Sequence, residues 1–384
     1  MPVFLIVFLT LYSALHAYAF AHAKAALHFG PKTGWFIAGL MLILILTPML
    51  VHILENAQLE FAARSFAQIG YLWMGFIFLF FWASLAFDLL RLLGFVSGWT
   101  LQRHASLFTI PRNISFFVSA ISVLAICVHG YFSALNFRIE RRVFETAKLP
   151  ADIERLKIVQ VSDIHLGLII RSKRLDKILD IVRSENPDLL VSTGDLVDGQ
   201  INHLLGLAER LQQIRPKYGK YAITGNHEYY AGIEHSLDFT RRAGFVILQD
   251  ASVKDQVINI VGVSDPAGRQ FGIKEGLSEK ALLDSVNKGR FTLFLKHRPV
   301  VEPGSLGLFD LQLSGHTHHG QIYPFTWFTT MVFPMNAGTF HLGKNSLLHV
   351  NRGTGTWGPP IRFLVPPEVT VIELVRSRDK GAHD

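Results

Sequence analysis

Hydrophobic positions follow two different patterns along the chain. In the first third they form four long runs, each near the length of about 20 residues with which a helix crosses a bilayer: Pro2–Ala21, Gly34–Leu54, Gly70–Leu90 and Ile114–Leu135. Further along, the hydrophobic runs are short, often β-branched, and stop at polar clusters. We therefore expect a multi-pass helical membrane region over residues 1–136, a linker over 137–154, a folded domain over 155–377 and a disordered tail over 378–384.

The composition fits a membrane protein better than an ordinary soluble chain. Hydrophobic residues make up 49% of the 384 residues, and charged residues only 17%. Lys and Arg gather in cytoplasmic loops, and the first and third loops between the runs carry five of them against one in the second. Four spans then place the C-terminal domain on the extracytoplasmic face of the cell membrane, although the basic residues over 138–148 favour the opposite orientation.

The net charge of +7 does not indicate nucleic-acid binding, because the basic residues are scattered and no motif of nucleic-acid-binding proteins occurs. A lipid bilayer and phosphate groups are the partners that this charge favours. The single cysteine, Cys127, lies in the fourth run, so the folded domain has neither a disulfide nor a thiolate nucleophile. The oligomeric state is not indicated.

Six short runs in the second part stop at Asp, His, Asn or Gly, as buried strands do where they enter loops. They are LKIVQVSDIHLG (156–167), PDLLVSTGDLVDG (187–199), YGKYAITGNHEYY (218–230), VINIVGVSD (257–265), FTLFLKHRP (291–299) and FDLQLSGHTHHG (309–320). Apolar residues at helical spacing over 175–182 predict a helix between the first two strands, and a similar stripe predicts one over His203–Ile214. This alternation predicts an α/β domain with functional groups at the carboxyl ends of its strands.

The residues that follow these strands are of the kinds that bind metal ions. They are Asp163, His165, Asp195, Asp198, Asn226, His227, His297, His316 and His318. Carboxylates and imidazoles with an amide oxygen suit Mn, Fe or Zn, and carboxylates gathered at one sheet edge repel one another unless cations neutralise them. Two ions therefore fit better than one, and could hold between them a hydroxide that attacks at neutral pH.

Five motifs in order carry a resemblance to a known family: SDIHLG, GDLVDG, GNHE, a histidine after an apolar strand, and GHTHHGQ. They resemble the calcineurin-like metallophosphoesterase superfamily, in particular its membrane-associated branch with the ending GHTHxGQ. The resemblance covers roughly residues 155–375. It implies two packed mixed β-sheets flanked by helices, and a metal-dependent phosphoric ester hydrolase, most of all a phosphodiesterase.

The resemblance also implies a role for each motif residue. His227 would protonate or stabilise the leaving oxygen, and Asp198 would support the site without binding metal. The metal ligands would be Asp163, His165 and His318 for one ion, Asn226, His297 and His316 for the other, and Asp195 as a bridge between them. The sequence does not choose among Mn, Fe, Zn and Mg.

Three residues beside the motifs have open roles. Arg298 follows His297, and Arg352 lies in the NRGTG loop. Both could clamp phosphate oxygens through paired guanidinium hydrogen bonds, or they could be solvated or structural arginines. His319 stands where this branch often has glycine, and is either a third site histidine or an exposed substitution.

The substrate is the least well indicated feature. The segment IYPFTWFTTMVFPM (322–335) predicts either a core strand with a turn, or an apolar lip that enters the bilayer or holds acyl chains. Because four spans exceed what a tether needs, we expect a phospholipid, glycolipid or lipid-linked (pyro)phosphate as substrate. The alternatives are a broad phosphodiesterase acting on nucleotides or other soluble phosphoesters, and a non-catalytic metal-binding scaffold or sensor attached to the membrane bundle.

Overall fold

The computed structural model describes residues 2–100, 110–199, 204, 206–253, 257–274 and 276–377. The tail expected over 378–384 lies outside the described residues. The chain forms two compact units: a helical unit of residues 1–132 with 358–361, and an α/β unit that comprises the rest.

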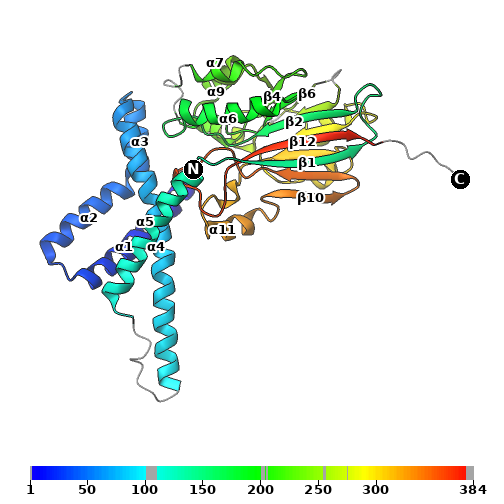
Figure 1. Ribbon diagram of the computed structural model, residues 1–384. Coiled ribbons are helices and arrows are strands. Elements are labelled where there is room, and N and C mark those ends of the chain that lie inside the picture. The colour runs from blue at the N-terminus through cyan, green and yellow to red at the C-terminus, as the bar shows by residue number, and fades with distance from the viewer. Residues whose placement is uncertain are drawn as a thin grey trace. The chain divides into compact units, whose positions relative to one another are not determined.

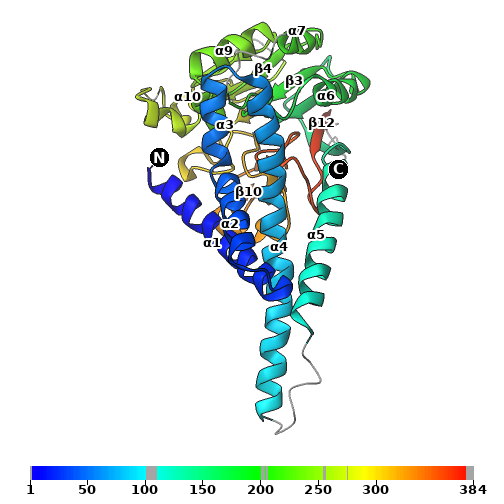
Figure 2. The ribbon, with the colours of Figure 1, turned by 90° about the vertical axis from the view of Figure 1, so that its left-hand side faces the viewer.

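The helical unit contains the four predicted hydrophobic runs (Figures 1 and 2). Its helices are α1 (Pro2–Leu27), α2 (Pro31–Ile45), α3 (Thr47–Asn56), α4 (Glu60–Thr100) and α5 (Arg112–Ser133). The helices α1, α4 and α5 are each long and apolar enough to cross a membrane. The second predicted span is a bent pair, because α2 and α3 meet at 54° where Pro48 interrupts the hydrogen bonding. The described residues thus supply three candidate spans, or four if the bent pair counts as one.

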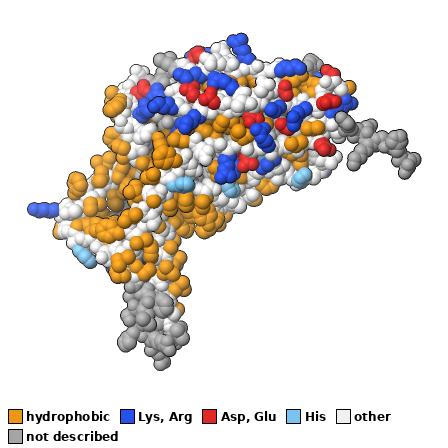
Figure 3. Space-filling view, viewed as in Figure 1, with side chains coloured by type: hydrophobic (Ala, Val, Ile, Leu, Met, Phe, Trp, Pro, Cys, Tyr) orange, Lys and Arg blue, Asp and Glu red, His pale blue; other side chains and the backbone are white. Residues whose placement is uncertain are grey.

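A polar cluster links helices within this apolar unit. The carboxylate of Asp88 in α4 accepts hydrogen bonds from the Tyr18 hydroxyl of α1 at 2.6 Å and from Arg91 at 2.8 Å. The Nε2 atom of His22 in α1 lies 3.0 Å from the same carboxylate. Figure 3 shows the hydrophobic side chains that otherwise cover these helices, whereas Lys, Arg, Asp and Glu side chains gather on the α/β unit.

The α/β unit contains two six-stranded mixed sheets (Figure 1). In the first sheet the order is β1 (Arg138–Thr146), β12 (Glu368–Arg376), β2 (Arg155–Val161), β3 (Leu189–Ser192), β4 (Lys220–Ala222) and β5 (Val246–Ile247). In the second it is β10 (Gly338–Gly343), β11 (Ser346–Val350), β9 (Leu311–Ser314), β8 (Thr292–Leu295), β7 (Asn259–Gly262) and β6 (Ala251–Val253).

One segment differs from the sequence-based expectation. Residues 138–146, expected to belong to a linker, form the edge strand β1, which pairs in parallel with β12 over its whole length. Its side chains alternate between exposed and half-buried positions. The strand therefore carries little hydrophobic signal, because an edge strand has only one neighbour and one weakly buried face.

The two sheets face each other across a shared hydrophobic core. Ile158 and Val191 of the first sheet and Leu293 and Leu313 of the second belong to this buried cluster. The predicted arrangement of two mixed sheets flanked by helices is thus confirmed.

Helices cover the outer faces. A second buried cluster joins the first sheet to α6 (Ser172–Glu185), α7 (Leu207–Gln212) and α9 (Ile233–Arg242), and a third joins the second sheet to α10 (Glu279–Asp284). The helix predicted from the stripe over 175–182 is α6. The helix predicted over His203–Ile214 is shorter, and residues 203 and 205 lie outside the described part.

Candidate metal centre

The predicted ligands lie in loops that directly follow strands. Asp163 and His165 follow β2, Asp195 follows β3, and Asn226 begins α8 (Asn226–Tyr230) after β4. In the second sheet His297 follows β8, and His316 and His318 follow β9. Since β2, β3 and β4 run parallel, as do β8 and β9, their carboxyl ends bring these loops together at one edge of the two sheets.

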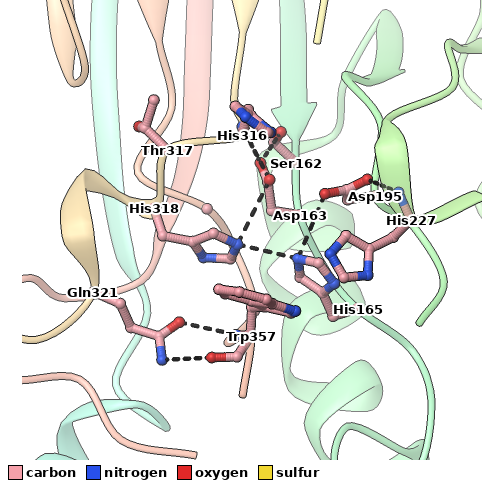
Figure 4. Close-up of polar contacts among 12 residues, drawn as sticks. Ser162, Asp163, His165, Asp195, His227, His316, Thr317, His318, Gln321 and Trp357 are labelled. Carbon is pink, nitrogen blue, oxygen red and sulfur yellow. Dashed lines mark hydrogen bonds and ion pairs between the residues drawn. The ribbon is translucent and has the colours of Figure 1, made fainter. Parts of the chain in front are cut away.

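One group consists of Asp163, His165 and His318, whose donor atoms all lie within 4.8 Å of one another. The Nε2 atoms of His165 and His318 are 3.0 Å apart, and Nε2 of His318 lies 3.6 Å from Oδ1 of Asp163 (Figure 4). All three side chains are buried. This is the set predicted for one ion.

A second group consists of Asp195, His297 and His316, whose donor atoms also lie within 4.8 Å of one another. Nε2 of His297 is 3.3 Å from Oδ2 of Asp195 and 3.1 Å from Nδ1 of His316. The amide oxygen of Asn226 lies 3.2 Å from the same Nε2 atom. Asp195 Oδ2 is also 3.8 Å from Nε2 of His165, so this carboxylate links the two groups.

These separations fit shared metal ions. Ligand atoms about 2.0–2.2 Å from one ion lie about 3–3.6 Å from each other, close to the 3.0–3.8 Å measured between the paired donor atoms. Burial lowers the pKa of His165 to about 4 and that of His316 to about 3, and burial together with Arg362 holds the pKa of His318 well below its usual value. These imidazoles are therefore neutral near pH 7, which is the form that binds metals.

His297 behaves differently. Burial alone would lower its pKa, but the Asp195 carboxylate at 3.3 Å outweighs burial and, with other nearby carboxylates, raises the pKa to about 10. In the metal-free protein a proton on His297 thus supplies positive charge beside Asp195. That is the place where a divalent cation would supply it instead.

The backbone of the ligand loops is unusual. Asp163, His165, Asp195, His316 and His318 all have positive φ, between 46° and 71°. Non-glycine residues rarely adopt this left-handed conformation, and it clusters at functional sites where the surrounding structure fixes it. Hydrogen bonds provide this support, for example from the backbone N–H groups of Asp163 and His165 to carbonyls of the β3 loop.

His227 lies beside the first group. Its ring stands edge-on to that of His165, with centroids 4.6 Å apart, and its Nδ1 is 2.9 Å from Oδ1 of Asp198. Burial lowers the pKa of His227, but the charges of Asp195 and Asp198 outweigh this and raise it to about 9. A donor atom of His227 also lies within 4.8 Å of His165 and Asp195, so position alone permits it as a ligand.

Comparison with known proteins places this site in a family. The family model of calcineurin-like phosphoesterases matches residues 156–320. An uncharacterized metallophosphoesterase of Aquifex aeolicus is 38% identical over 249 residues, which cover 64% of this chain and 95% of that protein. The chain belongs to the calcineurin-like phosphoesterases. This metallophosphoesterase is accordingly a metal-dependent phosphoester hydrolase.

A second relative carries both a membrane part and a metallophosphoesterase domain in its name. A transmembrane protein with metallophosphoesterase domain from Danio rerio is 30% identical over 297 residues, covering 73% of this chain and 68% of that one. Together with the apolar helices, this indicates a membrane protein. Among solved structures, a 5'-nucleotidase precursor from Thermus thermophilus is 18% identical with a TM-score of 0.33, over 58% of this chain and 54% of that chain.

Sequence reasoning about this metallophosphoesterase missed Glu228, although GNHE was among its motifs. The buried Glu228 carboxylate accepts hydrogen bonds from the backbone N–H groups of Gly225, Asp195 and Leu196, at 2.6, 3.0 and 2.7 Å. It thereby ties the Asp195 loop to the start of α8. Its place in the motif, one residue after His227, was the available signal, but nothing in the sequence names its distant backbone partners.

Arg362 was also missed. It is fully buried and donates hydrogen bonds to the carbonyl oxygens of Arg352, Gly353, Gly355 and His318. Its Nη2 atom lies 3.0 Å from Nδ1 of His318. A guanidinium so enclosed by carbonyl groups fixes the loop behind His318. Its sequence context, between prolines and apolar residues, gave no sign of this.

The three residues with open roles all have partners inside the protein. Arg298 pairs with Asp265 through two hydrogen bonds of 2.7 and 2.9 Å, and Arg352 bonds Glu368 at 2.7 Å as well as Glu140. His319 is half-buried, with Nδ1 2.7 Å from the side-chain oxygen of Asn336. These contacts favour structural roles. The φ of +48° at His319 also explains why glycine suits this position.

The segment 322–335 is not a core strand. Residues Phe325–Val332 form the helix α11, and among its apolar side chains Met331 is 79% exposed and Val332 70% exposed. The chain then returns to the site, where the ring of Phe333 packs edge-on against His316 with centroids 5.3 Å apart. An exposed apolar helix therefore adjoins the second ligand group.

Proposed function

We propose that this metallophosphoesterase is a multi-pass membrane enzyme that uses two divalent ions to cleave a phosphodiester or pyrophosphate bond of a lipid or lipid-linked substrate. The observation that carries the hydrolytic part is the meeting of two ligand groups at Asp195. Asp163, His165 and His318 would hold one ion, Asn226, His297 and His316 would hold the other, and Asp195 would contact both. When bound, such ions polarise the phosphate and make water a nucleophile at neutral pH.

His227 acts as the general acid in this proposal. Asp198 accepts the Nδ1–H of the protonated imidazole, which leaves Nε2–H to donate to the oxygen of the leaving group. The Asp198 carboxylate raises the pKa of His227 and so favours the protonated imidazole. Asp198 therefore orients His227 and holds its charge without binding metal.

The lipid part of the proposal is supported by α11. Exposed apolar side chains next to a polar site are favoured where a protein meets a membrane or acyl chains. Phe325, Trp327 and Phe328 are exposed on this helix, together with Met331 and Val332. The distribution of Lys and Arg in the loops between spans supports an extracytoplasmic catalytic domain. The orientation is tested by fusing, after Asp384, a reporter protein that is active only in the cytoplasm. Activity of this reporter would show that the orientation is wrong.

The first test is hydrolysis of bis(p-nitrophenyl) phosphate by the full-length protein in detergent, stripped of metal and then supplied with Mn²⁺. We expect turnover that depends on the metal and falls at least about 1000-fold in Asp195→Asn. The variant keeps the size of the side chain and an oxygen that can accept the backbone N–H of His227. Bound metal without turnover of this surrogate would mean either a substrate requirement that the surrogate does not meet or a non-catalytic metal-binding scaffold, and absence of turnover on lipid diesters as well would contradict the enzymatic proposal.

The lipid preference needs its own comparison. Changing Met331 and Val332 together to Gln and Thr removes exposed apolar surface without opening a cavity. We expect this variant to lose activity on phosphodiester lipids in mixed micelles while keeping its activity on bis(p-nitrophenyl) phosphate. Equal wild-type activity on soluble nucleotide diesters and lipid diesters would instead favour the broad soluble phosphodiesterase.

A further inference from the structure

Two half-exposed aromatic side chains flank His227. The ring of Trp357 lies 5.8 Å from the His227 ring and that of Tyr230 5.4 Å, both close to perpendicular to it. Trp357 is 49% exposed and Tyr230 47% exposed. Large aromatic side chains normally bury most of their surface, so two open rings beside one imidazole are available to contact another molecule.

The position of Trp357 is fixed by Gln321. The buried Gln321 side chain donates through Nε2 to the carbonyl oxygen of Trp357 at 3.0 Å and accepts the Trp357 backbone N–H through Oε1 at 2.9 Å (Figure 4). One amide thus satisfies both backbone groups of the tryptophan, as a neighbouring strand would.

The backbone of Gln321 is itself strained. Its φ of 56° and ψ of −44°, with a hydrogen bond from Ile322 N–H to the Gly320 carbonyl, form a γ-turn of the rare kind with positive φ. Such a conformation persists only where the surroundings impose it, and it clusters at functional sites. The GHTHHGQ motif therefore ends in a residue whose side chain and backbone together set the place of Trp357.

We propose that Trp357 and Tyr230 form a subsite for a ring on the leaving group, and that Gln321 positions Trp357 for this contact. The inference rests on the proposed function, because His227 marks the side of the phosphate on which the leaving group departs. Stacking surfaces beside the polar pair His227 and Asp198 suit a ring with an apolar face and polar edges. A nucleoside and the sugar-like ring of a lipid headgroup share this chemistry.

The leaving-group assignment is tested with two soluble substrates. Bis(p-nitrophenyl) phosphate and methyl p-nitrophenyl phosphate both release p-nitrophenol, but only the first carries a second ring on the retained side. We expect Trp357→Ala to raise KM about tenfold for both substrates, with unchanged metal content, and Trp357→Phe to restore KM to within about threefold. Trp35→Ala, at an exposed tryptophan of α2, is the matched control and should change neither value. An effect confined to the two-ring substrate, or no rescue by Phe, would overturn the proposal.

The role of Gln321 is tested by a double-mutant comparison. We expect Gln321→Ala to raise KM as Trp357→Ala does, and the double variant to be no worse than Trp357→Ala alone, because the two residues act through one ring. Fully additive losses would show that Gln321 does not act through Trp357. The same would follow if Gln321→Ala lowered kcat with KM unchanged.

A binding measurement separates this inference from the proposed function. Nitroaromatic rings quench tryptophan fluorescence on contact, so p-nitrophenyl phosphate should quench the wild type and the Trp35→Phe variant more strongly than Trp357→Phe. Quenching lost only in Trp357→Phe would support the subsite even if no variant hydrolysed any ester. Equal quenching in all three proteins would overturn the subsite while leaving hydrolysis unaffected.

Natural phosphodiesters test whether the ring that binds this subsite belongs to a nucleoside or to a lipid headgroup. Thymidylyl-thymidine has a nucleoside leaving group, phosphatidylinositol has a ring headgroup, and phosphatidylglycerol is a lipid diester without a ring. We expect Trp357→Ala to lose about tenfold in kcat/KM on whichever ring-bearing diester the wild type prefers, and little on phosphatidylglycerol. A wild type that prefers phosphatidylglycerol to both others would contradict the ring subsite.

Discussion

Two histidine–aspartate pairs in this chain have nearly the same length but different surroundings. Nδ1 of His227 is 2.9 Å from Asp198, and Nε2 of His22 is 3.0 Å from Asp88. In the helical unit Asp88 also accepts bonds from Tyr18 and Arg91, so its charge is already balanced. In the α/β unit His227 stands beside a group of carboxylates and neutral imidazoles whose donor atoms are placed to bind a metal cation. A hydrogen bond to a carboxylate therefore does not by itself make a histidine a catalytic acid, and its other neighbours decide.

The largest expected effect is a difference in kcat between substitutions of His227 and of His22. We expect His227→Asn to lower kcat by about 10²- to 10⁴-fold, the usual contribution of a general acid, and His22→Asn to stay within about twofold of the wild type. Turnover of bis(p-nitrophenyl) phosphate and metal content are measured on the same samples. Loss of metal in His227→Asn would instead make His227 a ligand, as its distance to His165 and Asp195 permits.

Glu228 tests whether the loop carrying Asp195 must be held for metal binding. Glu228→Gln keeps the side-chain shape but replaces one acceptor oxygen by an N–H₂ group, which faces backbone N–H donors. We expect Mn²⁺ affinity to fall about 10- to 100-fold, as when other residues that orient metal ligands are changed. Glu185→Gln is the control, because Glu185 is also buried but pairs with Arg141. Equal affinities in the two variants would contradict this role for Glu228.

The buried carboxylate of Asp163 should lower the free energy of unfolding of the metal-free protein near neutral pH. Burial is the main reason that its pKa is raised to about 6, against an ordinary value of 3.8. Since the folded-state pKa lies above the unfolded one, the free energy of unfolding falls as pH rises from about 4 to 6 and stays lower above that. Asp163→Asn should therefore raise the free energy of unfolding of the metal-free protein by about 1–3 kcal/mol at pH 7.

The measurement for Asp163 is urea unfolding of the chelator-treated protein at pH 4 and pH 7. The gain should nearly disappear at pH 4, where the wild-type carboxyl group is protonated. Asp88→Asn should instead lower stability, because Arg91 and His22 lose the charge that they share. A gain of equal size at both pH values would show that charge burial at Asp163 is not the cause.

The smallest effect concerns the pH dependence of turnover. Asp198 is one of the charges that raise the pKa of His227, so removing it lowers that pKa and the acid loses its proton at lower pH. In Asp198→Asn we expect the alkaline limb of the kcat profile to move down by about one pH unit, with only a few-fold change at pH 7. Asp88→Asn should leave the limb in place. An unmoved limb in Asp198→Asn would exclude His227 as the group that titrates there.

The positions of site residues that directly follow a hydrophobic strand were the best predicted from the sequence. Asp163, Asp195 and His297 directly follow hydrophobic runs that form β2, β3 and β8, so their place at the sheet edge follows from local pattern and parallel pairing. The bent second span was missed because hydropathy does not register the break before Pro48. The helix α11 was ambiguous because an exposed apolar surface and a core strand have the same composition.

Partners distant in sequence could not be predicted. Arg352 in its glycine-rich loop looks the same whether it clamps a phosphate or pairs with Glu140, which lies 212 positions away. The link between Gln321 and Trp357 likewise joins a motif to a segment 36 positions further on. Such contacts form because the sheets bring distant loops together, and a local sequence pattern does not predict which loops will meet.

The left-handed ligand loops have a consequence for the choice of metal. Five of the seven proposed ligand residues have positive φ, and hydrogen bonds of the backbone N–H groups within the folded domain support this conformation at four of them, Asp163, His165, Asp195 and His316. An arriving ion therefore has little chain left to order, and an occupied site can exchange its ion without unfolding its loops. We expect the ion found in the cell to follow supply and exchange after folding, so that growth conditions rather than the polypeptide set which divalent metal is present.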